Sequence, residues 1–256
     1  MNRFNDGIAK FILPLFVISM ISTVATAQSS SDKDNKIVLT PYLWGASING
    51  TSTIGMLPPL DIDASFSDLF SNLNFAASVH TEFWVGDWVF VIDPTYLSLE
   101  MEIGLPPSLP QDSSLAMEVD IWLVEAWVGY RFTENWEAIG GARYQSQDIS
   151  VNGLPNPPFP DNIGISENWT DWFIGARFRT DLGDKWFMIW RGDVVVAGDS
   201  DTSWNTSIFF NRRVGNKGNK ALNLGYRYFV NDYNNTGNYR WDVTQDGPVV
   251  GFTWVF

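Results

Sequence analysis

The chain of 256 residues contains no cysteine and only one histidine, His80. Without cysteine the fold has no disulfide framework, and one histidine with dispersed carboxylates leaves no ligand spacing for a transition metal. Basic residues are also scarce, with 16 lysines and arginines against 29 aspartates and glutamates. A nucleic-acid-binding protein needs a basic surface, so this balance argues against nucleic acid as a partner. We expect no metal and no other cofactor.

Long hydrophobic runs are missing after the first 27 residues. Two basic residues precede an apolar stretch over 11–25, which ends in the cleavage tripeptide Ala25-Thr26-Ala27. This pattern predicts a secretory signal peptide over 1–27, because the run is too short for a membrane-spanning helix. Its removal takes away two positive charges and one negative charge, which changes the formal net charge from −13 to −14. We expect the remaining chain, 28–256, to form one domain.

Hydrophobic residues nevertheless make up 45% of the chain. They must be distributed by alternation, which is typical of β-strands with two different faces. The final segment, 249–256, shows this most clearly, with Val250, Phe252, Trp254 and Phe256 on one face. A last strand that ends on an aromatic residue resembles the closing strand of bacterial outer-membrane β-barrels. The resemblance implies that this strand is recognised by the barrel-assembly machinery.

The chain repeats a unit of about 49 residues. Three short polar turns are each followed directly by a tryptophan, and these tryptophans, Trp88, Trp136 and Trp186, lie 48 and 50 residues apart. The longer segments between them open alike and 49 residues apart, at Gly55, Gly104 and Gly153. This pattern indicates hairpins with short turns at one end and long loops at the other, as in transmembrane β-barrels.

We therefore predict an all-β fold: a transmembrane antiparallel up-and-down β-barrel of about ten strands, with eight or twelve as alternatives. These alternatives remain possible if 57–64 pairs as its own strand or if one weak strand fails. The predicted strands are 37–54, 73–85, 88–103, 115–132, 136–152, 168–181, 186–198, 203–214, 220–232 and 239–256. Aromatic residues next to the turns would lie at the membrane interface, where amphipathic rings are stable; they are Trp88, Trp136, Trp186, Trp254 and Phe256.

The alternation favours an apolar outer face and a polar lumen, the reverse of a soluble barrel. It changes phase in three places. We expect β-bulges near Pro94 and near Gly247-Pro248, because a bulge shifts the alternation by one residue. The third change, between Glu118/Asp120 and Glu125, is either a bulge or a residue at the rim.

One segment between the first two strands is helical in pattern. Ser65-Phe66-Ser67-Asp68 resembles a capping box, and the apolar residues that follow share one helical face. We predict a short helix over 66–72. It is either a structured external loop or a plug in the mouth of the barrel, with Phe66, Leu69 and Phe70 as its candidate contact residues.

The chain resembles uncharacterised bacterial outer-membrane β-barrel proteins of porin-like annotation. The residues that carry this likeness are Pro41-Tyr42-Leu43-Trp44, Ser65-Phe66-Ser67-Asp68-Leu69, Gly225-Tyr226-Arg227-Tyr228, Tyr239, Asp242-Val243-Thr244, Gly247-Pro248 and Phe256. The resemblance implies a barrel in the outer membrane with lipid around it. It implies no catalytic residue or activity.

The alternation also predicts which charged side chains face the lumen. The predicted lumen residues are His80, Glu82, Glu100, Glu102, Glu118, Asp120, Glu137, Arg143, Asp171, Arg177, Arg179, Arg191, Asp193, Arg227, Arg240 and Asp242. Both signs in one cavity indicate a network of ion pairs, since unpaired charges there are costly. The interior is then either filled, as in a structural or surface-interaction barrel, or a narrow pore for ions or small solutes. The acidic excess belongs either to hydrated loops or to a mouth that attracts cations.

An enzyme is the third hypothesis, and it depends on His80. The alternation places Ser78, His80 and Glu82 on one wall, which supplies the residue types of a catalytic triad. Side chains two residues apart on a strand are about 6.5–7 Å apart at the backbone, however, which is loose for a triad. We therefore expect His80 to belong to the polar network of the lumen and the protein not to be an enzyme.

Overall fold

The computed structural model describes residues 35–55, 58–104, 114–153, 162–215, 218–235 and 239–256. The predicted signal peptide and most of the loops 104–112 and 153–161 therefore lie outside the described residues. Within the described residues no helix is long and apolar enough to cross a membrane.

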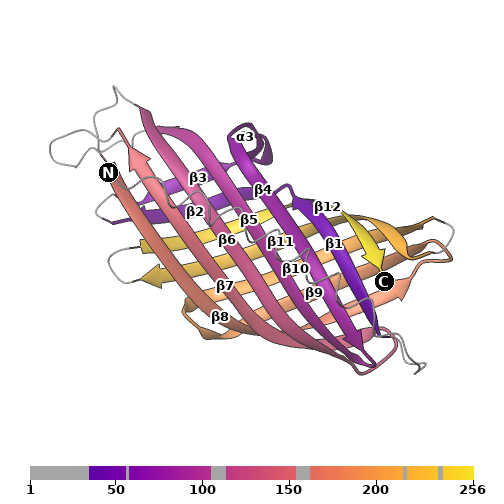
Figure 1. Ribbon diagram of the computed structural model, residues 1–256. Helices are drawn as coiled ribbons and strands as arrows, with labels where there is room; N and C mark the ends of the chain where they lie inside the picture. Colours follow the sequence, from indigo (N-terminus) through magenta and orange to yellow (C-terminus); the bar gives the residue numbers. More distant parts are fainter. Residues whose placement is uncertain (1–34, 56–57, 105–113, 154–161, 216–217, 236–238) are drawn as a thin grey trace, which may run out of the picture. The chain divides into compact units, whose positions relative to one another are not determined.

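Ten strands close into an antiparallel barrel, and two further strands extend it (Figure 1). The closed ring runs in the order β1-β4-β5-β6-β7-β8-β9-β10-β11-β12, and β12 pairs with β1. The ring strands are β1 (Lys36–Trp44), β4 (Leu73–Val85), β5 (Trp88–Gly104), β6 (Ser114–Arg131), β7 (Trp136–Asn152), β8 (Asn162–Asp181), β9 (Trp186–Gly198), β10 (Ser200–Val214), β11 (Lys220–Asn235) and β12 (Tyr239–Val255). The two additional strands are β2 (Ser47–Ile54) and β3 (Leu60–Ala64). The prediction of about ten barrel strands is confirmed.

The predicted first strand, 37–54, is divided into β1 and β2. Both pair with β12 in one unbroken register, from Val38 opposite Val255 to Ile54 opposite Tyr239. Of these two strands, however, only β1 pairs with β4, and β2 takes β3 as its other neighbour. The chain therefore leaves the ring after β1, and β2, β3 and helix α3 (Phe66–Ser71) precede its return at β4. We call β2, β3 and α3 the plug segment.

The outer face of the barrel carries a band of exposed apolar side chains between two rows of aromatic rings. One row lies at the end with the short turns and includes the predicted interface residues Trp88, Trp136, Trp186, Trp254 and Phe256. The second row includes Phe75, Tyr96 and Trp122, whose neighbouring ring centroids are 6.0 and 4.7 Å apart. Such a band between aromatic girdles is typical of the lipid-facing surface of a membrane barrel.

The height of this band fits a bilayer. The two rows lie eight residues apart on β7, from Trp136 to Tyr144. On β4 they lie ten residues apart, from Val85, which pairs with Trp88 of the first row, to Phe75. At about 3.3 Å per residue and a strand tilt of about 40°, this spacing gives roughly 20–25 Å, close to the apolar band of outer-membrane barrels.

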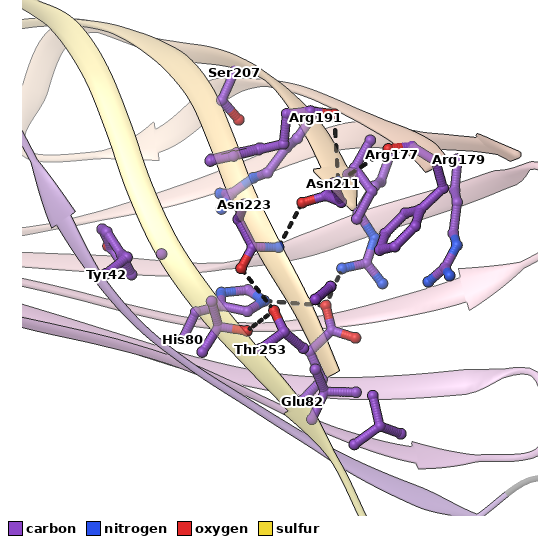
Figure 2. Close-up of a pocket in the computed structure, with 18 of the residues that line it drawn as sticks. Tyr42, His80, Glu82, Arg177, Arg179, Arg191, Ser207, Asn211, Asn223 and Thr253 are labelled. Atoms are coloured by element: carbon purple, nitrogen blue, oxygen red, sulfur yellow. Dashed lines mark hydrogen bonds and ion pairs between the residues drawn. The ribbon is translucent and has the colours of Figure 1, made fainter. Parts of the chain in front are cut away.

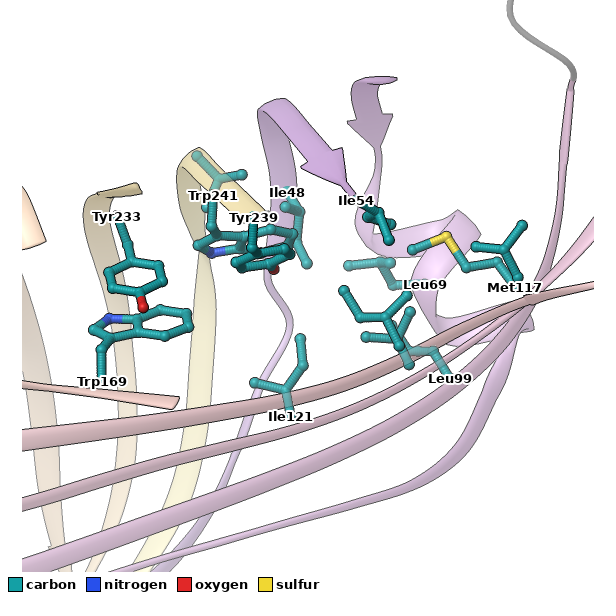
Figure 3. Packing of buried hydrophobic residues seen from close by; sticks show 14 residues of the cluster. Ile48, Ile54, Leu69, Leu99, Met117, Ile121, Trp169, Tyr233, Tyr239 and Trp241 are labelled. Carbon is teal, nitrogen blue, oxygen red and sulfur yellow. The ribbon is translucent and has the colours of Figure 1, made fainter. Parts of the chain in front are cut away.

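Beyond the second aromatic row the two faces exchange polarity. On β7 the outward positions change from Ala142 and Tyr144 to Asp148, while the inward positions change from Arg143 to Ile149. The inward side chains of this half pack into one hydrophobic cluster with those of the plug segment (Figure 3). The cluster consists of Ile48, Ile54, Leu69, Leu99, Met117, Val119, Ile121, Ile149, Val151, Trp169, Tyr233, Tyr239, Trp241 and Val243.

The two predicted β-bulges are wrong. β5 pairs with β6 from Trp88↔Tyr130 to Gly104↔Ser114 without a register shift, so Pro94 lies in a regular strand. β11 and β12 are equally regular through Gly247. The phase of the alternation changes because the surroundings of the outer face change, from a lipid-like band to water. The observed register shifts lie elsewhere, for example between Trp172 and Phe173.

The short helix is confirmed as α3. Ser65 caps it, because its hydroxyl accepts from the Asp68 amide while the Asp68 carboxylate accepts from the Ser65 amide. The Ser65 hydroxyl and the Ser65 amide both donate to the Asp68 carboxylate, and these two hydrogen bonds hold the pKa of the Asp68 carboxyl below its usual value. Leu69 is buried in the hydrophobic cluster, whereas Phe66 and Phe70 are exposed. The side of α3 that carries Leu69 therefore packs into the hydrophobic cluster, and the side that carries Phe66 and Phe70 does not.

The polarity exchange predicts effects of different size for the same substitution at two heights of β8. Ile174 lies in the middle of the apolar band with 55% of its surface exposed, and Ser166 is exposed beyond the band on the same face. We expect Ile174→Arg to lower the free energy of unfolding by about 2–4 kcal/mol and Ser166→Arg by about 0–1 kcal/mol. Urea unfolding in lipid vesicles measures both values. Equal costs at the two positions would contradict the placement of the band.

Candidate functional site

The structure separates the predicted lumen residues into two groups. Ten of the residues face inward: His80, Glu82, Glu137, Arg143, Asp171, Arg177, Arg179, Arg191, Asp193 and Arg227. The prediction is wrong for five others, which face outward: Glu100, Glu118, Asp120, Arg240 and Asp242. These five lie beyond the apolar band, where the outer face meets water and the inner face is the hydrophobic cluster. The side chain of Glu102 lies outside the described residues.

A buried ionic layer crosses the middle of the lumen. Arg143, with no exposed surface, donates to Glu125 at 2.8 Å and to Asp193 at 2.6 Å. Arg191 also bridges the same two carboxylates, at 2.7 and 2.8 Å. Shared partners of this kind satisfy charges that would be costly alone in a narrow interior. The layer is therefore a single network.

This layer closes the cross-section of the barrel. Glu125 on β6 and Arg227 on β11 lie five strands apart in the ring of ten, which places them on opposite walls. Their side chains nevertheless meet, with Arg227 Nη2 3.2 Å from Glu125 Oε1. Glu125 is absent from the predicted lumen list, because its strand also carries Glu118 and Asp120 on the other face. Its pairing opposite Arg143 in adjacent strands is the sequence feature that could have identified it.

A second ionic cluster lies nearer the short turns. Arg177 on β8 donates to Glu82 on β4 at 2.5 Å and to Glu137 on β7 at 2.6 Å. The Trp84 indole N–H also donates to Glu82, at 2.6 Å. Contacts between β4 and β8 again span the lumen, because these strands are four places apart in the ring.

His80 belongs to this second cluster. Its Nδ1 lies 2.8 Å from Asp93 and its Nε2 lies 3.0 Å from Glu82. Ionised carboxylates only accept, so both ring nitrogens must donate and the ring is an imidazolium. Neither nitrogen is left to take a proton from a nucleophile, and no hydrogen bond joins His80 to Ser78 within the described residues. Asp93, on the neighbouring strand β5, was missed because the predicted bulge placed it out of phase.

The buried members of the two clusters are electrically balanced. Their carboxylates are Glu82, Asp93, Glu125, Glu137 and Asp193, and their buried cations are His80, Arg143, Arg177, Arg191 and Arg227. A sixth cation, Arg131, is partly exposed and lies 4.0 Å from Glu137 at the edge of the second cluster. Balance among the buried groups is what a network needs inside a membrane, where an excess charge has little water to solvate it. Asp171 is not part of the network. It accepts from Ser200 instead, at the turn between β9 and β10.

Below the ionic layer the lumen opens into a chamber of about 460 Å³ (Figure 2). It extends from Arg191 and Arg227 to the rim at Lys220 and Val255, at the short-turn end. Four cations that belong to neither cluster line it near this rim: Lys36, Arg179, Arg213 and Lys220. Apolar side chains of β9 and β10 form part of its wall, namely Phe187, Ile189 and Phe209. We call this space the lower chamber.

Above the ionic layer the lumen is filled. Tyr239 on β12 donates to Gln147 on the opposite strand β7, and the Trp169 ring stacks on Tyr233 with centroids 4.3 Å apart. The plug segment completes the packing through Ile48, Ile54 and Leu69 (Figure 3). The described residues therefore close the lumen at two levels, an ionic layer and a hydrophobic plug. Among them no cluster of three or more His, Asp or Glu side chains could hold a metal ion.

No protein-family model and no curated protein matches this chain. Solved structures do. The outer-membrane protease OmpT from Escherichia coli aligns with a TM-score of 0.51 and 7% identity, over 90% of this chain and 100% of that one. The translocator domain of the autotransporter NalP from Neisseria meningitidis gives 0.44 and 12%, over 98% and 97%. Ail, the attachment invasion locus protein of Yersinia pestis, gives 0.35 and 9%, over 88% and 99%.

Such low identities show the fold alone, and the fold defines the class. The chain is a bacterial outer-membrane β-barrel protein, with lipid around its apolar band. The short-turn end is then the periplasmic end, and the plug segment lies toward the cell exterior. Recognition of the last strand by the assembly machinery stays a prediction.

The ionic layer predicts a large effect for Arg143. Replacing it with methionine leaves Glu125 and Asp193 short of a buried partner, so we expect Arg143→Met to lower the free energy of unfolding by about 3–5 kcal/mol. Arg240→Met is the matched control, because Arg240 pairs with Asp242 on the surface and exposed pairs contribute about 0–1 kcal/mol. Urea unfolding in vesicles measures both. Similar losses in the two variants would mean that the layer is not a stabilising network.

Proposed function

We propose that the protein is a gated pore for small solutes, closed in this structure by the plug segment and the ionic layer. The lower chamber is its periplasmic vestibule. His80 serves in this proposal as a member of the ionic network and not as a catalytic base. The single observation that carries the proposal is the difference between the two halves of the lumen.

The lower chamber is hard to explain in a barrel that only provides structure. In narrow barrels side chains fill the interior, because each empty volume forfeits packing contacts. The half of the lumen beyond the ionic layer follows that rule. The half at the short-turn end keeps about 460 Å³ open, and its lining holds seven lysines and arginines against three carboxylates. A space of this kind costs stability, and admission of a solute is a function that offsets the cost.

The plug segment has the attributes of a gate. It is one contiguous insertion between the first two ring strands, so it can move without breaking the closed ring. Its anchors are the pairing of β2 with β12 and the side chains that it buries in the hydrophobic cluster. In the ionic layer, the Arg227–Glu125 contact is the longest of the five ion pairs, at 3.2 Å. Opening therefore requires displacement of the plug segment and exchange of partners by Arg227.

Single-channel recording of the refolded barrel in a planar bilayer tests this proposal. We expect infrequent openings of the wild type, and a higher open probability with unchanged unit conductance for Leu69→Ser, because Leu69 anchors the plug segment by its burial in the hydrophobic cluster. Leu224→Ser, on the lipid-facing side of β11, is the matched control and should leave the open probability unchanged. Silence of both the wild type and Leu69→Ser, in protein that is folded by heat-modifiability, would refute a pore.

A disulfide lock identifies the gate, since the chain has no cysteine of its own. Thr51 and Asp242 are direct partners on β2 and β12, so oxidation of the pair Thr51→Cys and Asp242→Cys should hold the plug segment and abolish openings until reduction. The control pair, Val230→Cys and Thr244→Cys, joins β11 to β12 within the permanent ring and should have no effect. Openings that persist in the oxidised Thr51/Asp242 pair would place the gate elsewhere.

A further inference from the structure

The lower chamber has a charge opposite to that of the protein as a whole. The chain carries a formal net charge of −13, yet the chamber lining holds seven lysines and arginines against three carboxylates, Glu82, Asp93 and Glu137. The ionic network neutralises its own arginines, so the excess belongs to the four cations near the rim. A concave surface of one sign concentrates solutes of the opposite sign. The hypothesis of a cation-attracting mouth therefore does not fit the periplasmic end.

Two of these cations contact the same aromatic ring. The guanidinium carbon of Arg179 is 4.3 Å from the centroid of the Phe187 ring, and that of Arg213 is 4.9 Å from it. Arg213 pairs with Asp181, whereas Arg179 has no carboxylate partner among the described residues. Neighbouring guanidinium groups repel each other, and a shared anion relieves this repulsion while accepting hydrogen bonds from both.

Deeper in the chamber, buried donors also lack acceptors. Nε of Arg191 and Nε1 of Trp127 have no hydrogen-bond partner within the described structure, although both residues are more than nine-tenths buried and line the chamber. A buried unsatisfied donor costs about 1–3 kcal/mol, so such groups call for an acceptor. Figure 2 shows Arg177, Arg179 and Arg191 on the same side of this space.

The wall beside the arginines is apolar. Phe187, Ile189 and Phe209 line it on β9 and β10. Gly225 on β11 makes room for Phe209, because a Cβ at that position would lie 2.3 Å from the Phe209 ring. Ligand sites typically combine such apolar surface with a few polar groups that fix orientation.

We propose that the lower chamber binds a small organic anion, with the anionic group at Arg179 and Arg213 and the apolar body against Phe187, Ile189 and Phe209. The inference rests on the proposed function in treating the chamber as the place where a solute resides. Its test measures no current, so the two can fail separately.

The first experiment compares charged thiol reagents on a single cysteine. Val38 lines the chamber on β1, and Val38→Cys is the only cysteine of that variant. We expect a negatively charged sulfonatoethyl methanethiosulfonate to react about tenfold faster than the positively charged trimethylammonium analogue, relative to a free thiol. Arg179→Gln should reduce this preference several-fold. The control is Ser166→Cys, paired with Asp148 on the acidic outer face, where the cationic reagent should be favoured.

The second experiment tests saturable binding with benzoate as the probe. Benzoate should slow the reaction of Val38→Cys with a neutral methanethiosulfonate, and benzylamine, its cationic counterpart of similar size, should not. Arg179→Gln should abolish the protection while the reaction without benzoate stays unchanged. Equal protection by the two compounds, or protection by neither, would overturn the proposal. If benzoate does not protect Val38→Cys and the channel openings are normal, the pore proposal stands and only the anion site is refuted.

Discussion

The outer surface of this barrel meets two solvents, and the rest of the structure depends on that constraint. Within the band between the aromatic rows the outward side chains face lipid, so they are apolar and the polar groups lie inside. Beyond the second row the same strands stand in water, and the polar side chains move outward, as at Asp148 on β7, while Ile149 turns into the core. A regular strand satisfies both solvents without a bulge, because only the sequence changes phase.

The two halves of the lumen follow from this exchange. In the outer half the inward face is apolar, and the plug segment supplies the missing layer of a hydrophobic core through Ile48, Ile54 and Leu69. In the membrane half the inward face is charged, and it is stable because carboxylates and cations balance across the lumen, as in the contact of Arg227 with Glu125. The lower chamber is the exception to this balance. The excess of cations in its lining is the part of the lumen that packing and neutrality do not explain, and therefore the part that points to a solute.

Alternation along single strands predicts the barrel, the apolar band and the inward direction of residues such as Arg143 and Arg177, because each depends on one strand and its immediate solvent. It fails at Glu118 and Asp242, since a change of solvent and a bulge produce the same pattern along one strand. A comparison of neighbouring strands distinguishes these two causes. The phase changes at Asp93 on β5 and at Glu125 on β6, and these residues are direct partners, so the change occurs at one height of the barrel. Contacts across the lumen, such as His80 with Asp93 or Glu125 with Arg227, depend on side chains meeting in space. No sequence spacing encodes them.

The exchange of polarity is tested most directly by a series of single cysteines along β6, positions 116–130, each labelled with a polarity-sensitive fluorophore in lipid vesicles. The account predicts that even-numbered positions face outward throughout, with lipid-like emission from 122 to 130 and water-like emission from 116 to 120. Odd-numbered positions should stay buried along the whole strand. Exposure of the odd-numbered positions 117 and 119 would instead indicate a β-bulge in β6. That result would contradict the hydrophobic core of the outer half and its packing against the plug segment.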